Sequence, residues 1–266
     1  FTDRVQSQYL NSNIVCIIGL CPFMVDGNEV QLKNIISSAN LARKEAKRAE
    51  RGSCVIYDDS MGRSLQKEVE YANNMEKAFQ NHEFVVYMQP KIDLKKRQII
   101  GAEALIRWIK KDGTMIFPNE FIPVFEKNGF IIHLDYYVWE ETCKLLKKLK
   151  TDGVKTVPIS INVSRAHFYG NELKQRLLNL IKKYDLETRD IELEITESIC
   201  GDAPDAIYEL IRELQDLGFK IAMDDFGSGY SSLNSLKDIK VDVLKIEGRA
   251  RRPAYVALAT KEYFNA

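Results

Sequence analysis

The pattern of apolar and polar positions predicts strands and helices in alternation from Phe84 onward. Short apolar or alternating runs, each typical of a strand, are "FVVYMQPKID", "QIIGAEALIRW", "VPISINVS", "DIELEITES", "KIAMDDFG" and "VDVLKIE". Helical stretches at 134–150, 170–184 and 204–217 separate most of these runs. Repetition of this kind predicts an α/β fold with parallel strands covered by helices, either as an open sheet or as a closed (β/α)8 barrel.

The first 60 residues show a shorter pattern of strand, helix and strand. The run "IVCIIGL" predicts a buried strand, and the apolar stretch that contains it is too short for a membrane span. Apolar positions at helical spacing follow in "LKNIISSANLARKEAKRAERG", and "SCVIYD" predicts a second strand. Residues 61–80 then predict a connecting helix with apolar residues along one face.

Polar residues near the ends of these strands favour the barrel over the open sheet. Glu103 and Arg107 lie on one face of the strand in "EALIR", because alternate residues of a strand share a face. Asn162, Glu194 and Lys245 lie near the ends of three further apolar strands. A barrel builds its active site from such residues at the carboxyl ends of several strands.

Taken singly, each of these polar residues also has a purely structural explanation. Glu103 can pair with Arg107, and Asn162 can serve as a turn residue. Glu194 can be a solvated strand end, and Lys245 can extend its ammonium group to solvent. The sequence alone leaves both explanations open for each residue, and only their combination favours a site.

The stretch "IAMDDFGSGYSS" places two carboxylates at the end of a predicted strand. Asp224 and Asp225 can converge on one object only where the backbone bends, which the following glycine-rich turn allows. Adjacent carboxylates repel each other unless a positive group lies between them. Together with the acids, amide and lysine at the other strand ends, they suggest an all-oxygen site for Mg2+ or Mn2+. The three histidines, His82, His133 and His167, lack paired spacing, which disfavours zinc.

Composition limits the partners that the protein is expected to bind and the cellular compartment in which it is expected to lie. Lys plus Arg and Asp plus Glu number 38 each, so no bulk attraction to a DNA or RNA polymer or to an anionic membrane is indicated. The five cysteines show no metal-ribbon spacing, which favours a reducing, cytoplasmic location. The chain begins with Phe1, so a sensor or membrane segment could precede it, and the protein could be the cytoplasmic part of a membrane-anchored one.

The strings "EALIR", "SINVS", "ELEITES", "DDFGSGYSS" and "LKI", in this order, closely resemble the EAL-domain family of cyclic di-GMP phosphodiesterases. The resemblance runs from about Phe84 to Ile246 and implies a (β/α)8 TIM-like barrel. It also implies bacterial second-messenger signalling, in which cyclic di-GMP is hydrolysed to linear pGpG with Mg2+ or Mn2+, as two ions. The alternative is a catalytically degenerate EAL module that binds cyclic di-GMP or a protein partner.

The resemblance also implies a role for each matching residue. Glu103, Asn162, Glu194, Asp224 and Asp225 match the metal ligands of the family. Lys245 matches the lysine that positions the attacking water, and with Glu103 and Asp224 it forms the expected catalytic set. The residues expected to contact the substrate are Gln89, Arg107 and Asp225. Glu197 matches the acid that steadies the loop "FGSGYSS".

The two ends of the chain set the expected domain organisation. Residues 1–60 resemble the C-terminal part of an α+β GGDEF (diguanylate cyclase) domain, although the GGDEF signature is absent. This implies a linker helix at 61–82, an EAL domain at 83–247, and an upstream sensor or GGDEF domain in the full-length protein. A homodimer is left open.

After "VDVLKIE" the sequence departs from the family, which continues with a helix, a strand bearing a further catalytic glutamate and a final strand. Here "GRARRPAYVALATKEYFNA" follows instead, so the EAL domain is expected to be truncated and 248–266 to be an atypical tail. A shifted reading frame, an engineered junction, or segments joined across missing residues would each explain it. A chain truly ending this way is expected to leave strand edges unpaired and to hydrolyse poorly.

Overall fold

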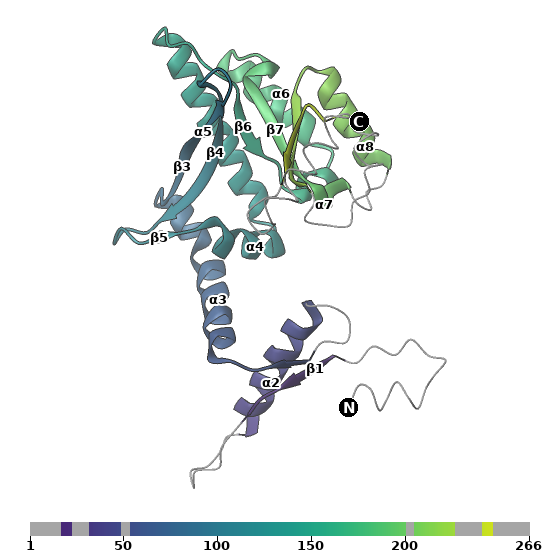
Figure 1. Cartoon of the computed structure of the whole chain (residues 1–266). Helices are drawn as coiled ribbons and strands as arrows, with labels where there is room; N and C mark the ends of the chain where they lie inside the picture. The colour runs from purple at the N-terminus through teal and green to yellow at the C-terminus, as the bar shows by residue number, and fades with distance from the viewer. Residues whose placement is uncertain (1–16, 23–31, 49–53, 201–204, 227–240, 247–266) are drawn as a thin grey trace. The chain divides into compact units, whose positions relative to one another are not determined.

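The computed structural model describes residues 17–22, 32–48, 54–200, 205–226 and 241–246 (Figure 1). The chain divides into two compact units, Phe1–Met75 and Glu76–Ala266. The tail predicted at 248–266 and the glycine-rich residues 227–232 lie outside the described residues. Within the described part of the chain, no helix is both long and apolar enough to cross a membrane.

The first unit contains the predicted strand, helix and strand. These elements are β1 (Ile18–Leu20), α2 (Leu32–Arg48) and β2 (Cys54–Ile56), and β1 pairs with β2 in parallel. The helix packs closely on β1, because a Cβ atom at Gly19 would lie 2.2 Å from the Ala39 carbonyl oxygen. Glycine at this position therefore permits the contact between helix and strand. The predicted connecting helix is α3 (Asp59–Gln80).

The second unit is built on a mixed sheet that contains all six predicted strands. The strands are β3 (Phe84–Asp93), β4 (Gln98–Ile109), β5 (Met115–Ile116), β6 (Ile159–Asn162), β7 (Ile191–Thr196), β8 (Lys220–Phe226) and β9 (Val243–Ile246). Their order is β3-β4-β6-β7-β8-β9, with the short β5 paired to β4. From β4 to β9 each strand is parallel to the next in this order, as predicted. Among the described residues they form part of a barrel wall whose edges are β3 and β9.

The prediction of parallel strands is wrong for β3, which pairs antiparallel with β4. The link between the two strands is residues 94–97, whereas a parallel pair needs a crossover of a dozen residues or more. The Asp93 carboxylate stabilises this tight turn by accepting hydrogen bonds from the backbone N–H groups of Lys95 and Lys96 at 2.8 and 3.0 Å. The length of the link therefore decides the direction of β3.

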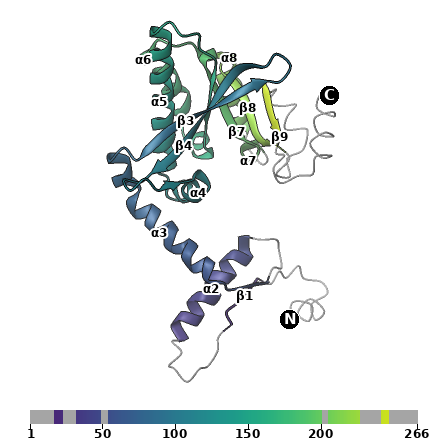
Figure 2. The ribbon, with the colours of Figure 1, turned by 60° about the vertical axis from the view of Figure 1, so that its left-hand side comes forward.

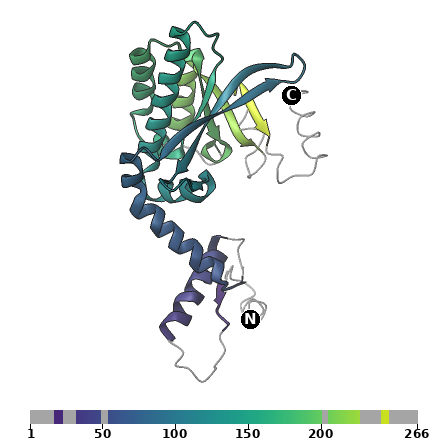
Figure 3. The ribbon, with the colours of Figure 1, turned by 90° about the vertical axis from the view of Figure 1, so that its left-hand side faces the viewer.

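Helices cover one face of the sheet and leave the other to polar residues. The helical elements are α4 (Pro118–Asn128), α5 (Ile131–Thr151), η1 (Arg165–Tyr169), α6 (Leu173–Tyr184), η2 (Thr188–Asp190), α7 (Glu197–Cys200) and α8 (Asp205–Asp216). Helices α5, α6 and α8 stand on one side of the strands (Figures 2 and 3). Along β4, Ala104 and Ile106 are buried, whereas Glu103 and Arg107 on the opposite face are half-buried. The uncovered face of β4 therefore carries the charged residues.

An aromatic cluster fills the core between β3, β4 and α4. Phe84 lies with its ring centroid 5.2 Å from that of Trp108, and Phe121 lies 5.3 Å from Phe125. Phe125 is fully buried and also contacts Trp108 at 6.0 Å. This packing holds β4, the strand that carries Glu103, against α4.

We expect Phe125→Ala to lower the free energy of unfolding by about 3–5 kcal/mol, because it removes a buried ring and leaves a cavity. Phe117→Ala is the matched control, since Phe117 is 52% exposed and its loss should change stability by only about 0.5 kcal/mol. Denaturant unfolding followed by circular dichroism measures both values. Equal stabilities of the two variants would contradict the assignment of Phe125 to the core.

Candidate metal centre

Three carboxylates from three strands converge on the uncovered face of the sheet. They belong to Glu103 on β4, Glu194 on β7 and Asp224 on β8, and one oxygen atom of each lies within 4.8 Å of the others. Glu194 is only 1% exposed, so it is not a solvated strand end. Burial of an unpaired carboxylate is costly, so this convergence requires positive charge nearby.

Lys245 on β9 supplies positive charge at the centre of these carboxylates. Its Nζ atom lies 3.1 Å from Glu103 Oε2, 2.7 Å from Glu194 Oε2 and 3.0 Å from Asp224 Oδ2. Burial lowers the pKa of Lys245, but the hydrogen bond to Glu194 and the three negative charges outweigh it and raise the pKa above its usual value. The lysine is therefore a charged ammonium group rather than a side chain extended to solvent.

Burial raises the pKa of Glu103, and the negative charges of Glu194 and Asp224 act in the same direction. Lys245 opposes this rise through its charge and its hydrogen bond. The structural explanation in which Glu103 pairs with Arg107 is not what the structure shows, because Glu103 forms its ion pair with Lys245 and Arg107 donates to the Ile106 carbonyl oxygen. The charge state of Glu103 thus depends on the other members of the cluster.

A second lysine, Lys91 on β3, was not among the predicted site residues. Its Nζ atom lies 2.7 Å from Glu192 Oε1 and 2.7 Å from Glu194 Oε1, and it also donates to the Ser160 hydroxyl. The Ser160 hydroxyl in turn donates to Glu192 Oε1 at 2.6 Å. Strand alternation could have revealed this network, because Gln89 and Lys91 share a face of β3, and Glu192 and Glu194 share a face of β7.

The residues of this face fit a hard divalent cation. Four carboxylates, of Glu103, Glu192, Glu194 and Asp224, surround the two ammonium groups of Lys91 and Lys245, so acidic groups outnumber basic ones by two in this network. Glu103, Glu194 and Asp224, which we call the three-carboxylate group, offer only oxygen atoms as ligands. Mg2+ and Mn2+ prefer oxygen over softer ligands. The donor set is therefore compatible with the predicted class of metal ion.

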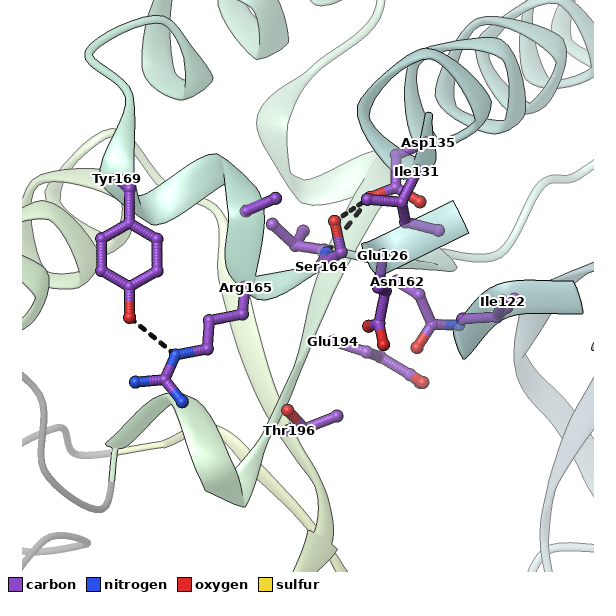
Figure 4. A pocket seen from close by; sticks show the side chains of 12 residues that line it. Ile122, Glu126, Ile131, Asp135, Asn162, Ser164, Arg165, Tyr169, Glu194 and Thr196 are labelled. Atoms are coloured by element: carbon purple, nitrogen blue, oxygen red, sulfur yellow. Dashed lines mark hydrogen bonds between the residues drawn. The ribbon is translucent and has the colours of Figure 1, made fainter. Parts of the chain in front are cut away.

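Asn162 and Gln89 lie beside the three-carboxylate group. Asn162 is the register partner of Glu194 on the neighbouring strand, and both line a cavity of about 490 Å3. Figure 4 shows the side chains of Asn162, Glu194 and Glu126 directed into the same part of this cavity. Gln89 is the register partner of Glu103 on β3 and is exposed. Both predicted residues are thus placed at the edge of the centre.

The structure does not bring Asp225 or Arg107 into the three-carboxylate group. Asp225 is exposed, has a φ of 55° and donates its backbone N–H to Asp224 Oδ1 at 2.9 Å. Its left-handed backbone conformation lies within β8, where the pairing with β9 shifts register between Met223 and Phe226, whereas the glycine-rich turn predicted to bend the chain lies outside the described residues. Arg107 donates from Nη1 to the carbonyl oxygen of Ile106. Glu197 is 3% exposed at the start of α7, but the loop that it was predicted to steady lies outside the described residues.

The far wall of the cavity is fixed by a buried aspartate. Asp135 Oδ2 on α5 accepts hydrogen bonds from the Ser164 hydroxyl at 2.6 Å and the Ser164 backbone N–H at 3.2 Å. The same oxygen lies 3.0 Å from His167 Nε2 on η1 (Figure 4 shows the Ser164 contacts). These contacts tie η1 to α5 and so shape the cavity beside Asn162. His167 is thus buried and held by Asp135.

Comparison with known proteins gives a consistent family assignment. The chain is 31% identical over 245 residues to the signaling protein YkoW of Bacillus subtilis, and this match covers 92% of the chain and 30% of YkoW. It is 30% identical over 230 residues to the bifunctional diguanylate cyclase/cyclic di-GMP phosphodiesterase MucR of Pseudomonas aeruginosa, covering 86% of the chain and 33% of MucR. The chain thus spans about one third of the length of these relatives.

A solved structure of the MucR phosphodiesterase in complex with cyclic di-GMP is 31% identical and aligns with a TM-score of 0.64. The alignment covers 71% of this chain and 75% of the MucR structure. The family profile described as the EAL domain matches residues 72–254, which is more than half of the chain. The strands that carry the three carboxylates and Lys245 lie inside this match. The chain therefore belongs to the EAL domain family.

Proposed function

We propose that this protein is a metal-dependent phosphodiesterase that hydrolyses cyclic di-GMP to the linear dinucleotide pGpG. The observation that carries this proposal is the convergence of Glu103, Glu194 and Asp224 around one lysine on the uncovered face of the sheet. The relatives support the choice of substrate, because MucR and the 27% identical PdeR of Escherichia coli are both named cyclic di-GMP phosphodiesterases.

In this proposal, Glu103, Asn162, Glu194, Asp224 and Asp225 hold Mg2+ or Mn2+, as two ions. A bound divalent ion lowers the pKa of water and stabilises charge on a phosphodiester. Lys245 orients the attacking water, since its ammonium group already lies within 3.1 Å of three carboxylates that would surround the reacting atoms. Gln89 and Arg107 contact the substrate from β3 and β4, and Glu197 steadies the loop after β8.

A catalytically degenerate binding module is the second candidate function. The observation that favours it is the position of Lys245, whose ammonium group neutralises part of the carboxylate charge without any metal ion. Such a centre could hold cyclic di-GMP without cleaving it. This candidate predicts binding of the dinucleotide with no metal-dependent turnover.

The deciding experiment is a hydrolysis assay with cyclic di-GMP, in which linear pGpG is separated by chromatography. We expect turnover with Mg2+ or Mn2+, loss of at least about 100-fold on addition of EDTA, and recovery when excess Mn2+ is restored, because a bound divalent ion would lower the pKa of the attacking water and stabilise charge on the phosphodiester. Ca2+ at the same concentration is the control for a general salt effect. Tight dinucleotide binding with no turnover under any of these conditions would support the second candidate instead.

The organisation of the full-length protein is also a proposal. Residues 1–60 would be the end of a GGDEF-like domain, 61–82 a linker helix and 83–247 the EAL domain, with a sensor or GGDEF domain upstream. MucR supports this arrangement, because it is named as bifunctional and its match covers 86% of the chain. We further propose a cytoplasmic location for this part of the protein and leave a homodimer as a question for sedimentation analysis.

A further inference from the structure

We infer that Lys91 is a positioning residue for the metal centre, which holds Glu194 so that a single carboxylate oxygen faces Glu103 and Asp224. This inference rests on the proposed metal-dependent function and adds to it a residue outside the predicted site. Lys91 lies on β3, at the edge of the described sheet. Within the described part of the chain it forms no ion pair with Glu103 or Asp224, the other two carboxylates of the centre. Its action on the centre therefore passes through Glu194.

The two oxygens of Glu194 are held by two different lysines. Oε1 lies 2.7 Å from Lys91 Nζ, and Oε2 lies 2.7 Å from Lys245 Nζ. Oε2 faces the side where Glu103 and Asp224 converge, because Lys245 contacts all three carboxylates there. A metal ion in the three-carboxylate group would thus meet one oxygen of Glu194, while Lys91 prevents the carboxylate from turning. Partners of this kind orient metal ligands and tune their affinity.

Lys91 is itself held firmly by its surroundings. An ammonium group has three N–H donors, and those of Lys91 meet three acceptors, on Ser160, Glu192 and Glu194. The Ser160 hydroxyl completes the network by donating to Glu192. Burial lowers the pKa of Lys91, but the bonds to Glu192 and Glu194 outweigh it and raise the pKa, so the side chain is charged. The network is therefore rigid enough to fix the orientation of Glu194.

The path of the Lys91 side chain depends on the curvature of the sheet. Strands β4 and β6 lie between β3 and β7, a span of roughly 14 Å in a flat sheet, which a lysine side chain cannot bridge. The sheet must therefore curl at this point. Gly101, the register partner of Lys91, packs beside the lysine stem, and an added Cβ there would make an ordinary contact of 3.6 Å with Lys91 Cδ but a tight one of 3.2 Å with the Pro158 carbonyl oxygen.

The competing explanation is that Lys91 only neutralises the buried carboxylate of Glu192. The two explanations differ in what happens when the positive charge is removed. Loss of a cation near a metal site should tighten the binding of Mn2+ by electrostatics alone. Loss of the group that orients Glu194 should instead weaken Mn2+ binding, typically by 10–100-fold for such partners.

The first test is Lys91→Met, studied by calorimetric titration of the metal-free protein with Mn2+. We expect the dissociation constant for Mn2+ to rise by about tenfold, although removal of a positive charge would by itself lower it. Lys95→Met is the matched control, because Lys95 is an exposed lysine of the same hairpin, and it should bind Mn2+ like the parent. Unchanged or tighter binding by Lys91→Met would overturn the inference. Thermal unfolding of each variant verifies that it is folded at the titration temperature.

The second test is the double variant Lys91→Met/Glu192→Gln, which removes one positive and one negative charge and so keeps the net charge of the network. We expect the same tenfold weakening, because Glu194 still lacks its donor. Recovery of the parent affinity would show that Lys91 only neutralises Glu192. If the parent itself fails to bind Mn2+, the proposed metal-dependent function is wrong, whereas parent binding with unchanged variants overturns the role of Lys91 alone.

Discussion

Asp224→Asn is expected to weaken Mn2+ binding by at least about 100-fold and to abolish metal-dependent hydrolysis. Asp224 contributes one of the three carboxylates within 4.8 Å of one another, so the change removes a charge and a ligand together. A unit charge about 4 Å away contributes on the order of 4 kcal/mol near a protein surface, which exceeds a 100-fold change in affinity. Calorimetry with Mn2+ and chromatography of linear pGpG measure the two effects.

The matched control for this substitution is Asp216→Asn. Asp216 is an exposed aspartate at the end of α8, away from the three-carboxylate group. Its variant should bind Mn2+ and hydrolyse cyclic di-GMP like the parent. If Asp224→Asn binds the metal as tightly as the control, the pair of aspartates is a turn and not part of a metal centre.

Lys245→Met is expected to reduce kcat for cyclic di-GMP by about 100- to 1,000-fold while leaving Mn2+ binding intact or tighter. The loss of rate follows if the ammonium group orients the attacking water or stabilises charge in the transition state. The gain in affinity follows because Lys245 Nζ now lies within 3.1 Å of all three carboxylates and competes with a cation for them. Steady-state kinetics and calorimetry on the same preparation separate the two effects.

Lys220→Met is the control for this variant, since Lys220 is an exposed lysine at the start of β8. Loss of Mn2+ binding together with loss of rate in Lys245→Met would assign the lysine a structural role. An unchanged kcat would remove Lys245 from the catalytic set altogether.

Removal of either lysine that contacts Glu194 is therefore expected to change the affinity for the metal ion, but in opposite directions. Lys245 meets the oxygen that faces the other carboxylates, so its removal should favour a metal ion. Lys91 meets the opposite oxygen, so its removal should release the carboxylate and disfavour the ion. A charge count alone predicts the same sign for both changes. Comparison of the two variants therefore separates charge from orientation at this centre.

The amino-acid sequence by itself determined the elements and the kinds of residue at their ends. Strands such as "ELEIT" and "KIAMDDF" are evident because side chains alternate between faces and because apolar runs of this length suit a buried strand. Glu103, Glu194, Asp224 and Lys245 could be selected for the same local reason, since each is a charged residue in an apolar strand. All four residues lie inside the match of residues 72–254 to the EAL domain.

The tertiary structure alone decided which charged groups meet. Lys91 and Glu194 are 103 positions apart, and they come together only because the sheet curls across two intervening strands. Asp224 and Asp225 are adjacent in the chain, yet only Asp224 joins the three-carboxylate group of the described residues, because the backbone turns at Asp225. Local pattern specifies the face of a strand, whereas the distance between side chains on different strands depends on register and curvature, which arise only when the whole sheet is assembled.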